Sequence, residues 1–415
     1  MRPGADRTRC CVHSRVGSPG RPIARRWWPA RGLPTWWALG GALTWIFLGC
    51  YLIFWGAHWD LDLRIYRAAE QSMLHGGAVY SETFTRYRLP FTYPPFALLA
   101  LTPVTFGSLA VAKDIWFLLI GLSSFGIVRA GLRCVQVPTA LGGAPMALLI
   151  SAICTIAIEP IRSNLDYGQV NLFLILCVVL DTLVLNSRHK GYLTGLAAAI
   201  KLTPIIYVVF FLIQGNRRAA VRATATFVTA QTIAWVFLPR DSITYWFHDA
   251  FSPSRTGNAS SRLNQSLYAT FHRFPFTDPK IQLSLWLAAV LVTVLHGVAV
   301  GRKLWAMDRP LEALLAVAFI EVLVSPISWS HHWSWVLLLP VVLIHRWGRW
   351  DLLQAAIGSV LLVALLAPYG WNVHGWSTAI LNNSLPLASI LLMIAWWRSA
   401  RADVPQPSVA APHGA

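Results

Sequence analysis

Two carboxylates near the start of the chain, and one lysine further along, stand where charged groups are costly. Asp60 and Asp62 follow the first long apolar run, in a chain with only 17 acidic residues. A carboxylate at a membrane interface is expensive and therefore usually has a role. The alternative is structural: Asp is a favoured N-cap, so either residue could begin the following helix. These residues alone leave both interpretations open.

Lys201 lies inside an apolar run that extends over 191–213. A lysine at mid-membrane costs at least ~2.5 kcal/mol unless it pairs or reaches the interface. Such a lysine commonly meets an anionic ligand or a carboxylate. Pro204 should interrupt the helix there and free backbone groups nearby. This favours a binding site for an anion around Lys201.

His331 and His332 join two apolar runs. Adjacent imidazoles can donate hydrogen bonds to a phosphate or titrate near neutral pH. A zinc site is disfavoured, because helical ligands need i, i+3 or i, i+4 spacing and no Cys or carboxylate is close in sequence. The structural alternative is an interfacial belt of His and Trp. Two further polar clusters are Tyr167-Gly168-Gln169-Val170-Asn171 and Asn264-Gln265-Ser266.

The elements that position these residues must be membrane helices. Of the 415 residues, 56% are hydrophobic and 12% charged, against about 25% charged in soluble domains. The 21 Trp residues often end apolar runs, as the headgroup layer favours. The net charge of +17 lies in short loops and a basic N-terminal arm, which argues for membrane orientation and against nucleic acid. The six cysteines form no disulfide or metal framework.

Apolar runs of about 20 residues recur along the chain, the length that crosses a bilayer. They predict an all-α polytopic membrane protein with about twelve transmembrane helices. No internal repeat is visible, which weakens a transporter built from duplicated halves. The runs are 36–55, 93–112, 114–131, 140–157, 168–186, 191–213, 219–238, 282–300, 311–328, 332–345, 352–369 and 384–397.

Basic residues in short loops orient the chain with both termini in the cytoplasm. We expect a disordered cytoplasmic arm over 1–35, a transmembrane domain over 36–400 and a disordered tail over 401–415. The long polar loops 56–92 and 239–281 then face outward. The topology of 113–213 stays open, although a broken helix near Lys201 would reconcile the charges with the span count.

Several motifs, in this order, resemble glycosyltransferase family 87, whose members belong to the GT-C superfamily. The first external loop carries Asp62-Leu-Arg-Ile-Tyr66, Gly76-Gly-Ala-Val-Tyr80 and Leu89-Pro-Phe-Thr-Tyr-Pro-Pro95. The later motifs are Gly168-Gln-Val-Asn171, Ala199-Ile-Lys-Leu-Thr-Pro204, Asn264-Gln-Ser266 and Ser325-Pro-Ile-Ser-Trp-Ser-His-His-Trp333. The resemblance covers roughly 36–400, and the joint occurrence is far more specific than any single motif.

The resemblance implies an enzyme of the bacterial cell membrane that acts in cell-envelope biosynthesis. It implies inverting transfer of mannose from a polyprenyl-phosphate-mannose donor to a glycolipid or lipoglycan on the outer face, forming an alpha-1,2 linkage. Asp62 matches the family's general base, and Asp60 is our second choice. We assign the donor phosphate to Lys201, His331, His332 and Arg64, and the sugar or acceptor to Tyr66, Tyr93, Gln169, Asn171, Asn264 and Gln265.

No acidic cluster suggests a divalent cation, so we expect an enzyme that needs neither metal nor cofactor. A multi-spanning transporter or flippase of a lipid-linked sugar is the rival, since it also predicts many spans and intramembrane charge. The identity of the sugar and of the acceptor, and which histidine contacts the phosphate, stay open.

Overall fold

The chain is described here by a computed structural model. Its described part is built from helices, with only two isolated β-bridges, so the predicted all-α class is confirmed for that part. The predicted N-terminal arm, the run 36–55 and the C-terminal tail lie outside the described residues. These are 60–135, 143–250, 252, 255, 257–273, 278–346, 351–371 and 377–402.

Long apolar helices are fewer than the apolar runs predict. In the described residues, three are long enough to cross a bilayer: α4 (Leu109–Cys134), α14 (Pro279–Ala306) and the stretch Leu352–Gly370. A fourth candidate is the pair α6 (Ala144–Ala157) and α7 (Glu159–Tyr167), which is bent by 77°. Other apolar runs are broken into shorter helices. The membrane character is supported, whereas the count of about twelve spans is not.

The remaining helices follow in chain order. They are α2 (Leu61–Leu74), η1 (Val79–Ser81), α3 (Pro95–Leu101), η2 (Thr102–Thr105), α8 (Asn171–Val179), η3 (Leu180–Val184), α9 (Tyr192–Ile200), η4 (Thr203–Ile206), α10 (Tyr207–Ile213), α11 (Arg217–Phe237), α12 (Pro239–Thr244), η5 (Tyr245–Asp249), α13 (Leu267–Arg273), α15 (Pro310–Val324), η7 (Ser330–Leu338), α16 (Leu339–His345), α17 (Leu352–Leu366), η8 (Pro368–Gly370), α18 (Ser377–Leu381) and α19 (Ser384–Ala402).

Two neighbouring helices show where core and lipid-facing surface lie. Nearly every residue of α15 is buried, as expected of a helix that is apolar all round and sits at the centre of a bundle. Only four residues of the longer α14 are buried, although it packs along α15. Because its outward face carries exposed leucines such as Leu287 and Leu291, lipid is the medium that suits it.

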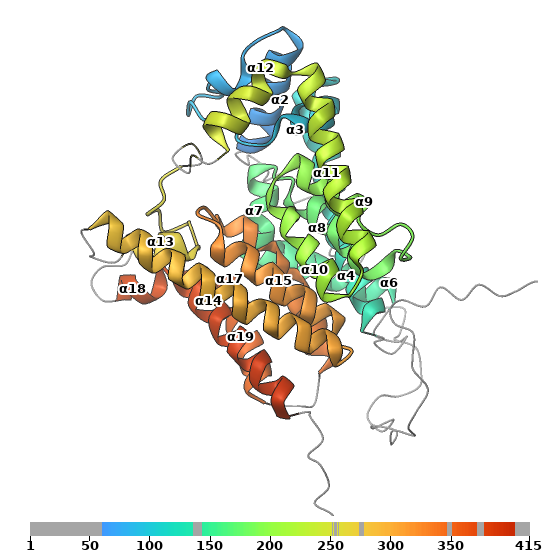
Figure 1. Cartoon of the computed structure of the whole chain (residues 1–415), viewed down its shortest axis with the longest axis vertical. Coiled ribbons are helices and arrows are strands. Elements are labelled where there is room, and N and C mark those ends of the chain that lie inside the picture. The colour runs from blue at the N-terminus through green and yellow to red at the C-terminus, as the bar shows by residue number, and fades with distance from the viewer. Residues whose placement is uncertain are drawn as a thin grey trace, which may run out of the picture.

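The two long polar loops meet each other. α12, which follows α11, contacts η1 of the first loop at one end of the molecule (Figure 1). The Arg255 guanidinium donates to the Tyr80 carbonyl at 2.8 Å, and the rings of Tyr80 and Tyr245 lie 5.3 Å apart. Further along the same loop, Asn264 forms a β-bridge with Trp329. The loop 239–281 therefore contacts both the first loop and the segment of the histidine pair.

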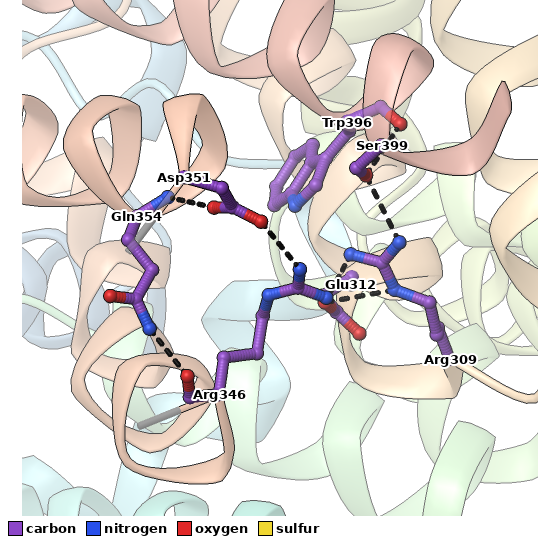
Figure 2. Close-up of polar contacts among 7 residues, drawn as sticks. All are labelled: Arg309, Glu312, Arg346, Asp351, Gln354, Trp396 and Ser399. Carbon is purple, nitrogen blue, oxygen red and sulfur yellow. Dashed lines mark hydrogen bonds and ion pairs between the residues drawn. The ribbon is translucent and has the colours of Figure 1, made fainter. Parts of the chain in front are cut away.

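A second charged region, which we call the arginine cluster, joins α15, α17, α19 and the end of α16. It consists of Arg309, Glu312, Arg346 and Asp351, with Gln354 and Ser399 (Figure 2). Arg309 binds Glu312 at 2.6 Å, and Arg346 binds Asp351 at 3.0 Å. Each guanidinium in this cluster thus has its own carboxylate.

Candidate active site

Asp62 lies in the first turn of α2, which begins at Leu61. The side chain is half-buried, and the Gln169 amide donates a hydrogen bond to its Oδ2 at 2.6 Å. Burial raises the pKa of Asp62 to about 6, while the Gln169 hydrogen bond and the nearby Lys201 charge act to lower it. A carboxyl with this pKa is ionised at neutral pH yet remains a useful proton acceptor.

Gln169 reaches Asp62 because the backbone beside it comes very close to α2. Gly168 ends α7 with a φ of 69°, and an added Cβ would lie 2.7 Å from Leu63 Cβ. The Trp116 indole holds this turn by donating to the Gly168 carbonyl at 2.9 Å. Only glycine fits this left-handed position so close to a packed helix.

Two tyrosines complete a buried network around Gln169. The hydroxyls of Tyr66 and Tyr93 lie 2.9 Å apart. Both donate toward Gln169 Oε1, at 3.3 Å and 3.0 Å. Tyr66 belongs to α2, whereas Tyr93 precedes α3 in the Pro-rich segment. The network fixes the amide orientation of Gln169, and through it the Asp62 carboxylate.

Lys201 lies at a break between two helices, as the sequence predicts. Its backbone is extended, with φ of −141° and ψ of 128°, between α9 and η4. The buried ammonium donates to Asn171 Oδ1 at 2.7 Å and lies 5.1 Å from the centre of the Tyr93 ring. Among the described residues, no carboxylate lies within ion-pairing distance of Lys201. Its charge is therefore available to an anionic ligand.

The rings of the two histidines lie edge to face, 4.8 Å apart, but their other partners differ. His332 Nε2 lies 3.2 Å from Lys201 Nζ. His331 turns toward the Tyr167 ring, 5.7 Å away, and its carbonyl accepts a hydrogen bond from Asn171. His332 is thus the histidine of the pair that contacts the Lys201 ammonium.

A small pocket lies beside Lys201, and we call it the lysine pocket. Glu321, Tyr207 and Trp335 also line it and were not among the predicted site residues. Glu321 had a signal similar to that of Lys201, a charged residue inside an apolar run. The pocket is lined by Asn171, Leu174, Ile175, Val178, Lys201, Thr203, Pro204, Tyr207, Glu321, His332 and Trp335.

Four predicted site residues are already engaged elsewhere. The Arg64 guanidinium binds Asp60 at 2.5 Å, and Lys113 lies 3.9 Å from the same carboxylate. Asp60 is 1% exposed and precedes α2, although its side chain makes no capping bond. The Asn264 amide bonds the backbone of Ala259, Pro326 and Ser328, and the Gln265 amide bonds that of Arg262, Asn382 and Leu385. Phosphate binding by Arg64 and sugar binding by these amides stay predictions.

The described side chains therefore join a proton acceptor and a cation through one network of contacts. Asp62 and Lys201 both reach Tyr93, the first through Gln169 and the second across the ring. This suits a reaction in which a hydroxyl loses a proton while an anionic group departs. Within the described ranges, no three His, Cys, Asp or Glu side chains gather in a way that could hold a metal ion.

Comparisons with known proteins give this geometry a family context. The profile of glycosyltransferase family 87 matches residues 91–326. The chain is 31% identical, over 76% of each chain, to a polyprenol-phosphate-mannose-dependent alpha-(1-2)-phosphatidylinositol mannoside mannosyltransferase of Mycobacterium tuberculosis. It is 32% identical, over 71% of this chain and 72% of the other, to the corresponding pentamannoside mannosyltransferase of Mycolicibacterium smegmatis. No solved structure matches this chain.

Proposed function

Because the chain belongs to glycosyltransferase family 87, we propose that it transfers mannose from a polyprenyl-phosphate-mannose donor to a hydroxyl of a glycolipid acceptor. Similar proteins named for this donor and for phosphatidylinositol mannoside acceptors support the substrate class. Their names also support an alpha-1,2 linkage. Acceptors of this class are membrane lipids, which suits a protein with apolar helices.

Asp62 acts as general base in this proposal. The acceptor hydroxyl gives its proton to the Asp62 carboxylate as its oxygen forms a bond to the anomeric carbon of the donor. The bond from that carbon to the phosphate oxygen breaks, and the lipid phosphate leaves with the electron pair. Attack opposite the leaving group inverts the anomeric centre. General base catalysis of this kind contributes typically about 10²–10⁴-fold.

Lys201 and His332 stabilise the departing lipid phosphate. A preorganised cation is most effective where negative charge develops in a site shielded from water. The single observation that carries the proposal is the buried Lys201 ammonium, bound to neutral groups and joined through Tyr93 to the Asp62 network. The contacts between the two charges run through Tyr66, Tyr93, Gln169 and Asn171, and we assign these side chains to sugar hydroxyls.

We place this site on the outer side of the cell membrane, with both termini in the cytoplasm. The support is the distribution of basic residues, which fall in the short loops on the opposite side of the predicted topology. The long loop 239–281, which contacts both the Tyr80 segment and the Trp329 segment, is then positioned to receive the acceptor.

The proposal is tested with membranes that contain the wild-type chain or Asp62→Asn. They are incubated with radiolabelled polyprenyl-phosphate-mannose and a phosphatidylinositol mannoside acceptor. We expect a mannosylated lipid from wild type alone, and methylation analysis of that product should show a 1,2 linkage. Absence of any product from wild type, or full activity in Asp62→Asn, would contradict the proposal. Activity that persists in EDTA is expected.

A further inference from the structure

Glu321 is a half-buried carboxylate that the proposed reaction does not use. It lies in α15, which carries two carboxylates, Glu312 and Glu321. Glu312 is paired with Arg309 in the arginine cluster. Glu321 forms no ion pair among the described residues, and its carboxylate faces the lysine pocket. Placing an acid there is costly, so it calls for a role beyond packing.

The polar side chains around Glu321 come from the two segments that carry the proposed phosphate ligands. The Tyr207 hydroxyl donates to Glu321 Oε2 at 2.6 Å, and the Thr203 side chain lies near enough to favour the charged carboxylate. Both follow the helix break at Lys201. Trp335, three residues after His332 in η7, is the third polar side chain near the carboxylate. One carboxylate thus joins the lysine segment and the histidine segment to the central helix.

The break explains why Lys201 needs such an anchor. A residue inside a continuous helix is positioned by the turns before and after it. Lys201 has extended backbone and η4 begins only at Thr203, so helical hydrogen bonds position it from the preceding side alone. Its place in the pocket then depends on where Thr203 and Tyr207 are held. Glu321 holds both.

Glu321 also supplies negative charge to the pocket without forming an ion pair with Lys201. A carboxylate in direct contact with Lys201 would compete with a phosphate ligand. A carboxylate elsewhere on the wall of the same pocket offsets part of the cost of burying the ammonium, because charges attract over several ångströms at low dielectric. The ammonium keeps neutral partners, Asn171 and His332, and an anion can still approach it.

We propose that Glu321 is a positioning residue of the donor site, which anchors the interrupted segment 201–207 and thereby holds Lys201 against the donor phosphate. The proposal rests on the proposed function. It predicts a specific kinetic pattern, since misplacing a binding group by about 1 Å can cost about 100-fold. Loss of Glu321 should weaken the use of the lipid phosphate donor and leave the acceptor KM unchanged.

The experiment uses the full chain in lipid nanodiscs, with Glu321→Gln, Glu321→Ala, Tyr207→Phe and the matched control Glu312→Gln from the same helix. We expect Glu321→Ala to lower kcat/KM for the donor by about 100-fold and Tyr207→Phe by about tenfold. Glu312→Gln should retain the wild-type donor KM. A second readout needs no turnover: polyprenyl phosphate should raise the Tm of wild type and Glu312→Gln more than that of the Glu321 variants.

A double-mutant cycle with Lys201→Met separates positioning from a general loss of stability. If Glu321 acts through Lys201, the pair Lys201→Met and Glu321→Ala is no worse than Lys201→Met alone. Losses that multiply, or a Glu321→Gln enzyme with wild-type donor KM and ligand-induced Tm shift, overturn the inference. If Glu321→Ala fails to fold, Glu321→Gln and Tyr207→Phe decide. An inactive wild type would instead contradict the proposed function.

Discussion

The lysine pocket and the arginine cluster both contain cations inside the protein, but the partners of these cations differ. In the arginine cluster, Arg309 and Arg346 each bind a carboxylate, at 2.6 Å and 3.0 Å (Figure 2). In the lysine pocket, the ammonium of Lys201 binds an amide oxygen and an imidazole. The carboxylate of that pocket, Glu321, accepts a hydrogen bond from the Tyr207 hydroxyl.

This difference distinguishes charges that stabilise the fold from charges that are available to bind a ligand. A buried ion pair satisfies both members, so it ties helices together and attracts no further ion. A buried cation surrounded by neutral partners has already lost its hydration and keeps its attraction for an anion. The same contrast separates Asp60, which is paired with Arg64, from Asp62, which is bound by an amide.

The largest expected effect is on Asp62. Asp62→Asn keeps the shape of the side chain and removes the base, so kcat should fall about 10²–10⁴-fold. Asp60→Asn should act chiefly on stability, because it leaves Arg64 without its carboxylate. Steady-state rates and the Tm of both variants check this contrast. A larger rate loss in Asp60→Asn than in Asp62→Asn would reverse the assignment.

The next effect concerns the unpaired cation. Lys201→Met should lower kcat/KM for the donor about 10²–10³-fold, the loss seen when one group that stabilises developing charge is removed. Lys303, which lies over the Trp397 ring at 5.0 Å, offers a matched control. Lys303→Met should leave donor kinetics unchanged. Equal losses in the two lysine variants would show that general charge, and not the pocket, attracts the donor.

The arginine cluster should respond in stability and not in chemistry. Arg309→Met leaves Glu312 buried without its partner, which typically costs about 3–5 kcal/mol. The double variant Arg309→Met with Glu312→Leu should recover part of that loss. Tm and activity per folded molecule in detergent are the measurements. A raised donor KM in Arg309→Met would contradict the idea that the arginine cluster only stabilises the fold.

The pH dependence of the rate should report Asp62. Because its pKa is raised to about 6 and the base acts ionised, kcat/KM should fall tenfold per pH unit below that pKa. Rates on saturating acceptor between about pH 4.5 and 8 provide the profile. An acidic limb near the ordinary aspartate pKa, about 4, would argue that Asp62 is not the base.

The smallest effect is expected at Glu70, a fully buried carboxyl in α2 for which the described residues supply no hydrogen-bond partner. Burial raises its pKa to about 9, so the folded state holds a proton that the unfolded state releases above its ordinary pKa. The resulting stability is complete below about pH 4.5 and is lost as the pH rises toward 9. Glu70→Gln should therefore raise Tm more at about pH 8 than at about pH 5. The kinetics should stay unchanged. A lower Tm at pH 8 would contradict this.

Residue type and spacing singled out the charged and polar segments, and the family motifs selected the site residues among them. Asp62 and Tyr93 were selected through those motifs, and the structure joins both with Gln169 in one network. Lys201 and Pro204 predicted a broken helix, which is present. The same reasoning missed Glu321, although it too is a charged residue inside an apolar run. It also could not show that the Asn264 and Gln265 amides are hydrogen-bonded to backbone.

By itself, the sequence determined the apolar, helical character of the protein and the identity of its unusual charges. The reason is that hydropathy and the cost of burying charge act locally along the chain. The tertiary structure decided which charges are paired. Asp60 and Asp62 look alike in sequence, but α2 turns one toward Arg64 and the other toward Gln169, 107 residues away. Pairing depends on contacts between distant segments, and those contacts leave Lys201 free to meet an anion.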